Sequence, residues 1–302
     1  MSLPKTVLIT GANGQLGYEL QKTVPNGVKL IATDADTLDI TRSRQISLAL
    51  EQHQPDCIIN AAAYTAVDKA ESDDESAWLI NNTAPALLAQ ALTARMEQGL
   101  PAIRMVQIST DFVFDGQQST PYAPDAPTEH PLGVYGASKL AGEQAVLRYL
   151  PEALVIRTSW LYSAHGHNFV KSMLRLMQEK EQLGIVYDQV GSPTWAATLA
   201  TTIWSLLDQQ ASGIHHCSDN GVASWYDFAA AIQALALELG LLDKVIPLRP
   251  IRSHEYPTPA RRPSYSVMDK SATEALLGRT LPYWRDSLRA MLEELKQNTD
   301  KA

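Results

Sequence analysis

The chain has 302 residues, of which 45% are hydrophobic and 19% charged, so it has a globular composition and the length for one large domain or a large domain with a smaller partner. Acidic residues outnumber basic ones by 33 to 25, and the net charge of −8 disfavours a general binder of nucleic acid or of an anionic membrane. The two cysteines, Cys57 and Cys217, exclude a disulfide scaffold and a CxxC metal or redox motif. The chain shows no signal-peptide pattern and no apolar stretch near the roughly 20 residues that span a bilayer, so we expect a cytoplasmic protein.

Short apolar runs alternate with helical patterns in the first half of the chain. Strands are predicted over these runs, at Thr6–Thr10, Val28–Thr33, Asp56–Asn60, Ile103–Ser109 and Ala153–Thr158. Helices are predicted between them, at Gln15–Val24, Ser43–Gln52, Ser76–Glu97 and Tyr135–Tyr149. Strands separated by helices imply right-handed crossovers, and continuous apolar strands fit burial on both faces. The pattern predicts an α/β fold with a Rossmann-like, doubly wound parallel sheet.

The second half is less regular and is expected to form a smaller α/β part. Helices are predicted at Phe169–Lys180, Ala196–Gln209, Trp225–Leu239, Lys270–Leu277 and Trp284–Lys296. Residues 247–263 carry five prolines in 17 positions, which predicts an ordered loop rather than a helix.

Three glycines, Gly11, Gly14 and Gly17, follow the first predicted strand and open the first helix. Glycine has no Cβ and lets the backbone approach a pyrophosphate, while a helix N-terminus offers free N–H groups and a positive dipole end. A glycine-rich structural turn is the alternative, and the GxxGxxG spacing is one residue longer than that of many dehydrogenases. Its place between strand and helix predicts a dinucleotide site.

An acidic residue, Asp34, ends the second predicted strand. A carboxylate there accepts hydrogen bonds from an adenosine ribose and repels a 2′-phosphate, which favours NADH or tolerance of both NADH and NADPH. Arg42 or Arg44 would offset the repulsion, and Asp39 and Ile40 would flank the adenine. The alternative is an exposed loop acid.

Tyr135 and Lys139 form a YxxxK motif at the start of a predicted helix. Residues four apart share a helix face, so the lysine can lie beside the phenol. Bringing the pKa of the phenol from about 10 to neutral pH takes roughly 4 kcal/mol, which a lysine and a nicotinamide cation together would supply. The phenol then gives a proton to a carbonyl while hydride arrives from the cofactor. A lone YxxxK is more often a solvated helix face, but the glycine loop upstream favours the catalytic interpretation.

The sequence Ser109-Thr110-Asp111 ends the fourth predicted strand. Carboxyl ends of strands face the cofactor in doubly wound sheets, so a hydroxyl there can hold a substrate carbonyl. A simple strand cap is the alternative.

These motifs together resemble the extended short-chain dehydrogenase/reductases and, within them, the dTDP-4-dehydrorhamnose reductase family. The resemblance spans about residues 5–296 and includes NAAAYTAVDKAE (60–71), STDFVFDG (109–116), VYGASKLAGE (134–143), RTSWLY (157–162), DQVGSPT (188–194) and YPTPARRP (256–263). It implies reduction of the C4 ketone of a dTDP-6-deoxy-hexulose with NADPH or NADH, the last step of dTDP-L-rhamnose synthesis. It also implies a dinucleotide-binding Rossmann domain at 1–163 and a mainly substrate-binding part at 164–302, some of whose segments return to the first domain.

The resemblance also assigns roles to single residues. Tyr135 would donate the proton, Lys139 would orient the cofactor ribose and lower the tyrosine pKa, and Thr110, Asp111 and Trp160 would contact the sugar. The cofactor would lie along Gly11, Asn13, Gly14, Gln15, Leu16, Gly17, Asp34, Asp39, Ile40, Ala62, Ala63, Tyr64, Thr65, Tyr135 and Lys139.

An arginine in the proline-rich segment suggests where the nucleotide diphosphate would bind. The planar fork of Arg262, stiffened by nearby prolines, is suited to clamp phosphates. The alternative is an arginine that is merely exposed, like its neighbour Arg261.

The chain departs from the family pattern at several positions. Phe112 stands where the family has a tyrosine, and Gly133 replaces an asparagine. Some relatives form dimers bridged by magnesium through glutamates; Glu19 and Glu294 resemble two of these ligands, but the third falls on Ala197. We therefore expect no protein metal site, give magnesium a doubtful place among the cofactors, and expect a monomer or weak homodimer.

Two other functions compete with a keto-sugar reductase. A sister epimerase or dehydratase could share the scaffold, although Phe112 after Asp111 disfavours the acidic pair that a dehydratase uses. A relative serves as a non-catalytic regulatory subunit of methionine adenosyltransferase and binds a nicotinamide cofactor and a partner protein. Retention of Thr110, Tyr135 and Lys139 favours an enzyme.

The histidines show no metal-binding spacing. His215 and His216 lie in a predicted strand, where one is expected in the core and the other exposed. His165 and His167 flank a glycine and are interpreted as a turn.

Overall fold

The computed structural model describes residues 3–300, which are organised around a six-stranded parallel sheet. Its strands, in spatial order, are β10 (Gly213–His216), β5 (Leu154–Thr158), β4 (Arg104–Thr110), β3 (Cys57–Asn60), β1 (Thr6–Thr10) and β2 (Lys29–Ala32). In register, Ile9 lies between Ala32 of β2 and Ile59 of β3. The strand order reverses at β1, which leaves a crevice beyond the carboxyl ends of β1 and β3. The predicted doubly wound parallel sheet is confirmed.

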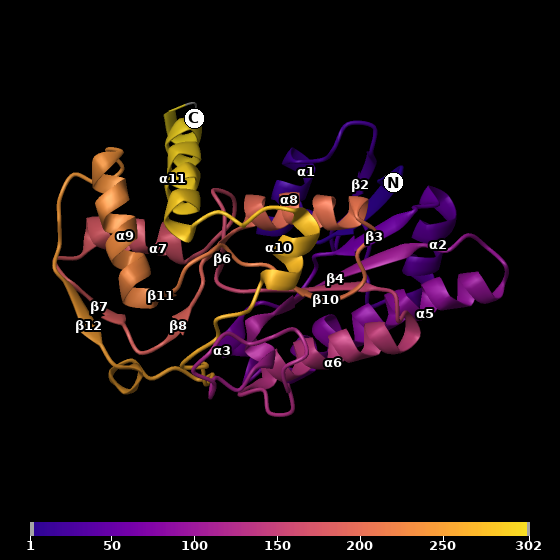
Figure 1. Ribbon diagram of the computed structural model, residues 1–302, viewed down its shortest axis with the longest axis horizontal. Helices are drawn as coiled ribbons and strands as arrows, with labels where there is room; N and C mark the ends of the chain where they lie inside the picture. The colour runs from indigo at the N-terminus through magenta and orange to yellow at the C-terminus, as the bar shows by residue number, and fades with distance from the viewer. Residues whose placement is uncertain (1–2, 301–302) are drawn as a thin grey trace.

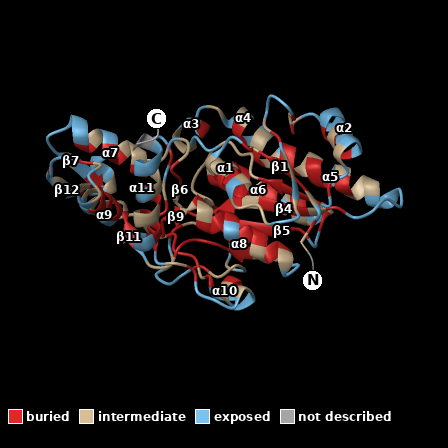
Figure 2. Cartoon of the chain, turned by 90° about the horizontal axis from the view of Figure 1, so that it is seen from above, coloured by how far each residue is buried: buried red, intermediate tan, exposed pale blue. Residues whose placement is uncertain are grey.

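Helices cover both faces of the sheet (Figure 1). They are α1 (Gln15–Lys22) and α8 (Ala196–Asp208) on one face, and α2 (Ser43–His53), α5 (Ala84–Glu97) and α6 (Val134–Tyr149) on the other. Successive residues of β1 alternate between the two cores, because Val7 and Ile9 pack towards α1 and α8 while Leu8 packs towards α2 and α5. Figure 2 shows the resulting buried sheet within an exposed periphery.

The predicted single helix at Ser76–Glu97 is wrong in one respect, because a π-helical turn interrupts it. The run consists of α4 (Asp74–Trp78), the π-turn Leu79–Thr83 and α5. Pro85 has no N–H to donate to the Asn81 carbonyl, so the α-helical hydrogen-bond ladder breaks there. The short helix α3 (Val67–Ala70) was not predicted.

The second half of the chain builds a smaller lobe beside the sheet (Figure 1). Its hydrophobic core lies among α7 (Phe169–Glu179), α9 (Trp225–Glu238) and α11 (Trp284–Asp300). Three two-stranded sheets complete it: β7 (Leu183–Val186) with β12 (Leu248–Ile251), β6 (Leu161–Tyr162) with β9 (Thr194–Trp195), and β8 (Val190–Gly191) with β11 (Ala223–Ser224). Helix α10 (Ser271–Leu277) packs against α8 and β10.

Two expectations for the second half are wrong. Residues 247–263 are not loop throughout, because β12 and a 3-10 turn at Ser253–Glu255 lie within them; Pro250 is tolerated because β12 pairs on one side only. His215 and His216 are both buried, at 8% and 0% exposure. Helix α10 packs against β10, and His216 also contacts Phe114 and the carbonyl of Asp269. Within residues 3–300, no helix has the length and apolar character needed to cross a membrane.

Candidate active site

A cavity of about 720 Å³ lies at the carboxyl ends of the sheet strands. Thr10 of β1, Thr110 of β4 and Thr158 of β5 contribute to its wall, as expected for the crevice of a doubly wound sheet. Most of the predicted cofactor and catalytic residues line it, namely Gly11, Asn13, Gly14, Gln15, Leu16, Gly17, Asp34, Asp39, Ile40, Ala62, Ala63, Thr65, Thr110, Asp111, Tyr135 and Lys139. Tyr64, Trp160 and Arg262 are not among its lining residues.

The glycine-rich loop leaves no room for side chains at two positions. Gly11 has φ +68°, and a Cβ there would lie 2.7 Å from the backbone nitrogen of Ala62. A Cβ on Gly17 would lie 2.6 Å from the Cα of Ala12. Gly14 precedes α1, whose free N–H groups lie at this end of the cavity. The loop therefore fits a dinucleotide pyrophosphate.

The carboxylate of Asp34 ties the loop after β2 to the glycine-rich loop. One oxygen accepts from the backbone N–H of Asn13 at 2.8 Å, and the other accepts from that of Ala35 at 2.8 Å. Arg42, considered above as a counter-charge for Asp34, forms an ion pair with Asp39 at 3.4 Å. The Thr41 hydroxyl and Arg42 together hold the pKa of Asp39 below its usual value. Two carboxylates, those of Asp34 and Asp39, therefore line this part of the cavity.

Tyr135 lies at the first turn of α6 and lines the cavity with Thr110 and Asp111. Burial raises the pKa of Tyr135 to about 12; hydrogen bonding with Thr110 lowers it, and the charge of Asp111 raises it further. The Thr110 hydroxyl donates to Asp111 at 3.1 Å, and burial raises the pKa of Asp111 to about 6. The ring of Phe112 packs edge-on against Tyr135 at 5.4 Å between centroids. The phenol is thus held protonated at neutral pH.

Lys139 is 3% exposed, and its ammonium donates to the carbonyl of Ile108 at 2.6 Å. Burial lowers the pKa of Lys139 to about 8, although the charge of Glu143 opposes the change. The influences on the pKa of Tyr135 come from burial, Thr110 and Asp111, so a lowering by Lys139 stays a prediction.

The N-terminus of α6 is fixed by a carboxylate from a distant motif. Glu71 accepts from the backbone N–H of Val134 at 2.9 Å, where the positive end of the helix dipole favours an anion. A Cβ at Gly133 would lie 2.5 Å from the same carboxylate oxygen. Glycine at this position therefore gives Glu71 access to the start of the helix that carries Tyr135.

Two residues assigned to the substrate are held by distant partners. The Trp160 ring stacks on Trp225 at 3.6 Å, and its backbone has φ +45°. The guanidinium of Arg262 forms a bidentate ion pair with Asp68 of α3, at 2.7 and 3.0 Å. The fork that was expected to clamp phosphates thus holds a carboxylate, and the clamp stays a prediction.

His165, Gly166 and His167, interpreted above as a turn, belong to the loop 163–168, which docks on the glycine-rich loop. His165 Nε2 lies 2.9 Å from the carbonyl oxygen of Asn13, and the Asn168 amide donates to Gln15 at 2.9 Å. Gly166 and His167 line the cavity. This contact could not be predicted from local patterns, which do not reveal which loop a turn contacts. The position of the loop directly after RTSWLY was the one signal in the sequence that it lies near the site.

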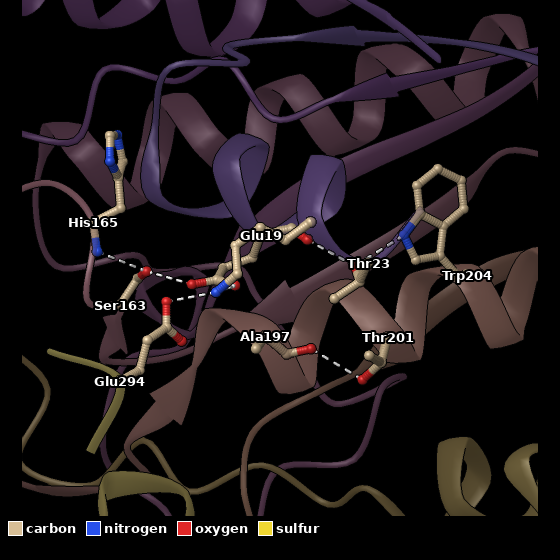
Figure 3. Close-up of polar contacts among 9 residues, drawn as sticks. Glu19, Thr23, Ser163, His165, Ala197, Thr201, Trp204 and Glu294 are labelled. Carbon is tan, nitrogen blue, oxygen red and sulfur yellow. Dashed lines mark hydrogen bonds and ion pairs between the residues drawn. The ribbon is translucent and has the colours of Figure 1, made fainter. Parts of the chain in front are cut away.

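The residues do not fit the bridging magnesium that the family resemblance raised. Figure 3 shows Glu19 and Glu294 near each other, with Ala197 on the neighbouring helix. The ammonium of Lys22 pairs with both carboxylates, and Ala197 offers no side-chain oxygen. No group of three or more His, Cys, Asp or Glu residues in the described part of the chain could hold a metal ion.

Comparison with known proteins identifies relatives over nearly the whole chain. The profile of the RmlD substrate binding domain family matches residues 5–297. The dTDP-4-dehydrorhamnose reductase of Burkholderia thailandensis is 40% identical over 96% of this chain and 98% of its own, and that of Escherichia coli is 37% identical over 97% and 99%. A crystal structure of the Bacillus anthracis dTDP-4-dehydrorhamnose reductase in complex with NADP superposes with a TM-score of 0.88, at 36% identity over 96% of this chain and 99% of that one. The chain belongs to the RmlD substrate binding domain family.

Proposed function

We propose that this protein reduces the C4 ketone of dTDP-4-dehydro-6-deoxy-L-mannose to dTDP-L-rhamnose with NADPH or NADH. The observation that carries the proposal is that Thr110, Tyr135 and Lys139 line one cavity with the glycine-rich loop. The names of relatives at 36–40% identity along nearly the whole chain support the same substrate.

The bound nicotinamide supplies the hydride, and the protein supplies the proton and the orientation. Tyr135 carries its proton at neutral pH, so it can donate to the carbonyl oxygen as charge develops there. The Thr110 hydroxyl lies at the end of β4, where it can hydrogen-bond the same oxygen. Lys139, fixed by the Ile108 carbonyl, orients the cofactor ribose beside Tyr135.

The substrate lies across the joint between the two parts of the chain in this proposal. Residues 1–163 bind the dinucleotide, and residues 164–302 mainly bind the dTDP-sugar. Asp111 and Trp160 contact the sugar, and Arg262 exchanges Asp68 for the diphosphate. The protein acts in the cytoplasm as a monomer or weak homodimer.

The proposal is tested by following NADPH or NADH absorbance at 340 nm with freshly made dTDP-4-keto-6-deoxyglucose, with and without the 3,5-epimerase. Oxidation that requires the epimerase supports dTDP-rhamnose formation. Oxidation without it would replace this substrate with another deoxysugar. Absence of oxidation by a protein that still binds cofactor would contradict reductase activity and favour a regulatory subunit.

The Tyr135→Phe variant tests the assigned proton donor. Loss of general acid catalysis should lower kcat by about 10²-fold or more, because the carbonyl oxygen then lacks its proton source. The cofactor dissociation constant, measured by fluorescence titration, should stay close to that of the wild type. A variant with wild-type kcat would exclude Tyr135 as the donor.

A further inference from the structure

The first and last long helices of the chain are joined by one lysine. The ammonium of Lys22, in the last turn of α1, lies 2.5 Å from a carboxylate oxygen of Glu294 on α11 and 3.3 Å from one of Glu19. The same ammonium lies 5.4 Å from the centre of the Tyr18 ring. Two residues of α1, Tyr18 and Glu19, and one of α11 therefore surround a single positive charge.

The carboxylate of Glu19 needs a positive partner because it is fully buried. Its Oε1 accepts a hydrogen bond from the Ser163 hydroxyl at 2.6 Å, and its Oε2 has no hydrogen-bond partner but faces Lys22. An uncompensated buried charge costs several kcal/mol, and the Lys22 ammonium offsets part of that cost for Glu19. Burial lowers the pKa of Lys22, but Glu294 and Glu19 raise it by more, so that the ammonium stays charged.

The same surroundings are poorly suited to a divalent cation. Magnesium requires near-octahedral oxygen ligands at about 2.0–2.1 Å, whereas the lysine ammonium already lies between the two carboxylates. Ala197, in the first turn of neighbouring α8, presents a methyl group, and its backbone carbonyl accepts from the Thr201 hydroxyl at 3.0 Å. The cluster therefore has two carboxylates and one resident monovalent cation.

We infer that Lys22 is the built-in cation of this cluster, which bridges Glu19 and Glu294 within one chain and leaves no place for a divalent metal. The bridge fastens α11 to the helix that begins at the glycine-rich loop. Through Ser163, whose hydroxyl also accepts from the backbone N–H of His165 at 3.1 Å, it also reaches the loop 163–168 at the cofactor cavity. Since both carboxylates are neutralised internally, a metal shared between two copies of the chain has nothing to bind here.

The inference is tested with the purified full-length protein after EDTA treatment. Melting temperature and molar mass, from differential scanning fluorimetry and sedimentation, are measured with and without millimolar MgCl₂ or MnCl₂. The wild type should show no metal-dependent change in either quantity. A magnesium-dependent dimer, or a rise in melting temperature that EDTA reverses, would overturn the inference.

Variants at Lys22 test its role directly. Lys22→Met should lower the melting temperature by several degrees and make it rise again with MnCl₂, because two unpaired carboxylates are left behind. Lys22→Arg keeps the charge and should remain insensitive to metal, and Lys180→Met removes an exposed lysine elsewhere as the matched control. A Lys22→Met protein as stable as the control would contradict the inference. If Lys22→Met does not fold, the wild-type metal titration still decides the question.

Discussion

The predicted cofactor end of the cavity, around the glycine-rich loop, and the residues assigned to the substrate are held in place in different ways. The cofactor end is lined by short contiguous segments that follow β1 and β3, with glycines at two positions where a side chain has no room. The assigned substrate residues are side chains held by partners far away in the chain, such as Arg262, which pairs with Asp68 194 residues earlier. The predicted cofactor end is made by the fold of one sheet, whereas the positions of the assigned substrate residues depend on how the two lobes meet.

The largest effect is expected from Gly17→Ala, which tests whether the cofactor end depends on backbone fit. The new Cβ would collide with backbone atoms of Ala12, which cannot shift without moving β1. Cofactor binding in a fluorescence titration should be lost, with far-UV circular dichroism checking the fold. Gly184→Ala, whose Cβ meets only movable side-chain atoms of Ile251 at 3.2 Å, is the control and should bind normally. Normal cofactor binding by Gly17→Ala would show that the cofactor end does not depend on the lack of a side chain at this position.

The free energy of unfolding should depend on pH through Asp219, which lies at the joint between the lobes. This buried carboxylate accepts from the backbone N–H of Trp195 at 3.0 Å, and burial raises its pKa from 3.8 to about 6. The folded state therefore binds this proton more tightly than the unfolded chain, so this group makes stability fall as pH rises from 4 to 6. The contribution is at most about 3 kcal/mol.

Urea unfolding of the wild type and of Asp219→Asn at pH 4.5, 5.5 and 7 measures this contribution. His216, whose pKa burial lowers to about 3, makes stability rise with pH over the same range, so the difference between the two proteins is the informative quantity. The free energy of unfolding of the variant should gain on that of the wild type as pH rises. A difference that is independent of pH would show that Asp219 does not titrate in this range.

A smaller effect, on substrate affinity, is expected from Arg262→Ala compared with Asp68→Asn. If the guanidinium clamps the diphosphate, its removal should raise the KM for the dTDP-sugar about tenfold and leave the cofactor dissociation constant unchanged. Asp68→Asn should then leave KM unchanged or lower it, since it frees the arginine. Equal increases in KM for both variants would mean that the ion pair only fixes the segment around Arg262.

The smallest effect is expected from His165→Ala, which removes a contact between the second half of the chain and the cofactor loop. One hydrogen bond of ordinary strength is lost at Asn13, so the cofactor dissociation constant should rise about threefold to fivefold. His254→Ala, at an exposed position, is the control and should have no effect. An unchanged cofactor dissociation constant for His165→Ala would show that only residues from the first half of the chain contribute to cofactor binding.

The contrast between features set by neighbouring residues and features set by distant partners also explains how much could be predicted from the sequence. The strands and the glycine-rich loop were predicted because apolar runs and glycine spacing are local signals of burial and close approach. The π-turn was missed because it arises from the missing N–H of Pro85 within an otherwise helical pattern. The burial of both His215 and His216, and the pairing of Arg262 with Asp68, were missed because each depends on a partner that only the folded chain selects.

The position of β10 at the edge of the sheet has a consequence for synthesis of the protein on the ribosome. The five other strands are complete once residue 158 has emerged, but β5 remains without its outer neighbour until residues 213–216 follow. During that interval the nascent chain exposes an apolar strand edge, which is a template for pairing with another chain. Ribosome pausing in the intervening stretch would therefore favour aggregation, and faster elongation there would protect the yield of folded protein.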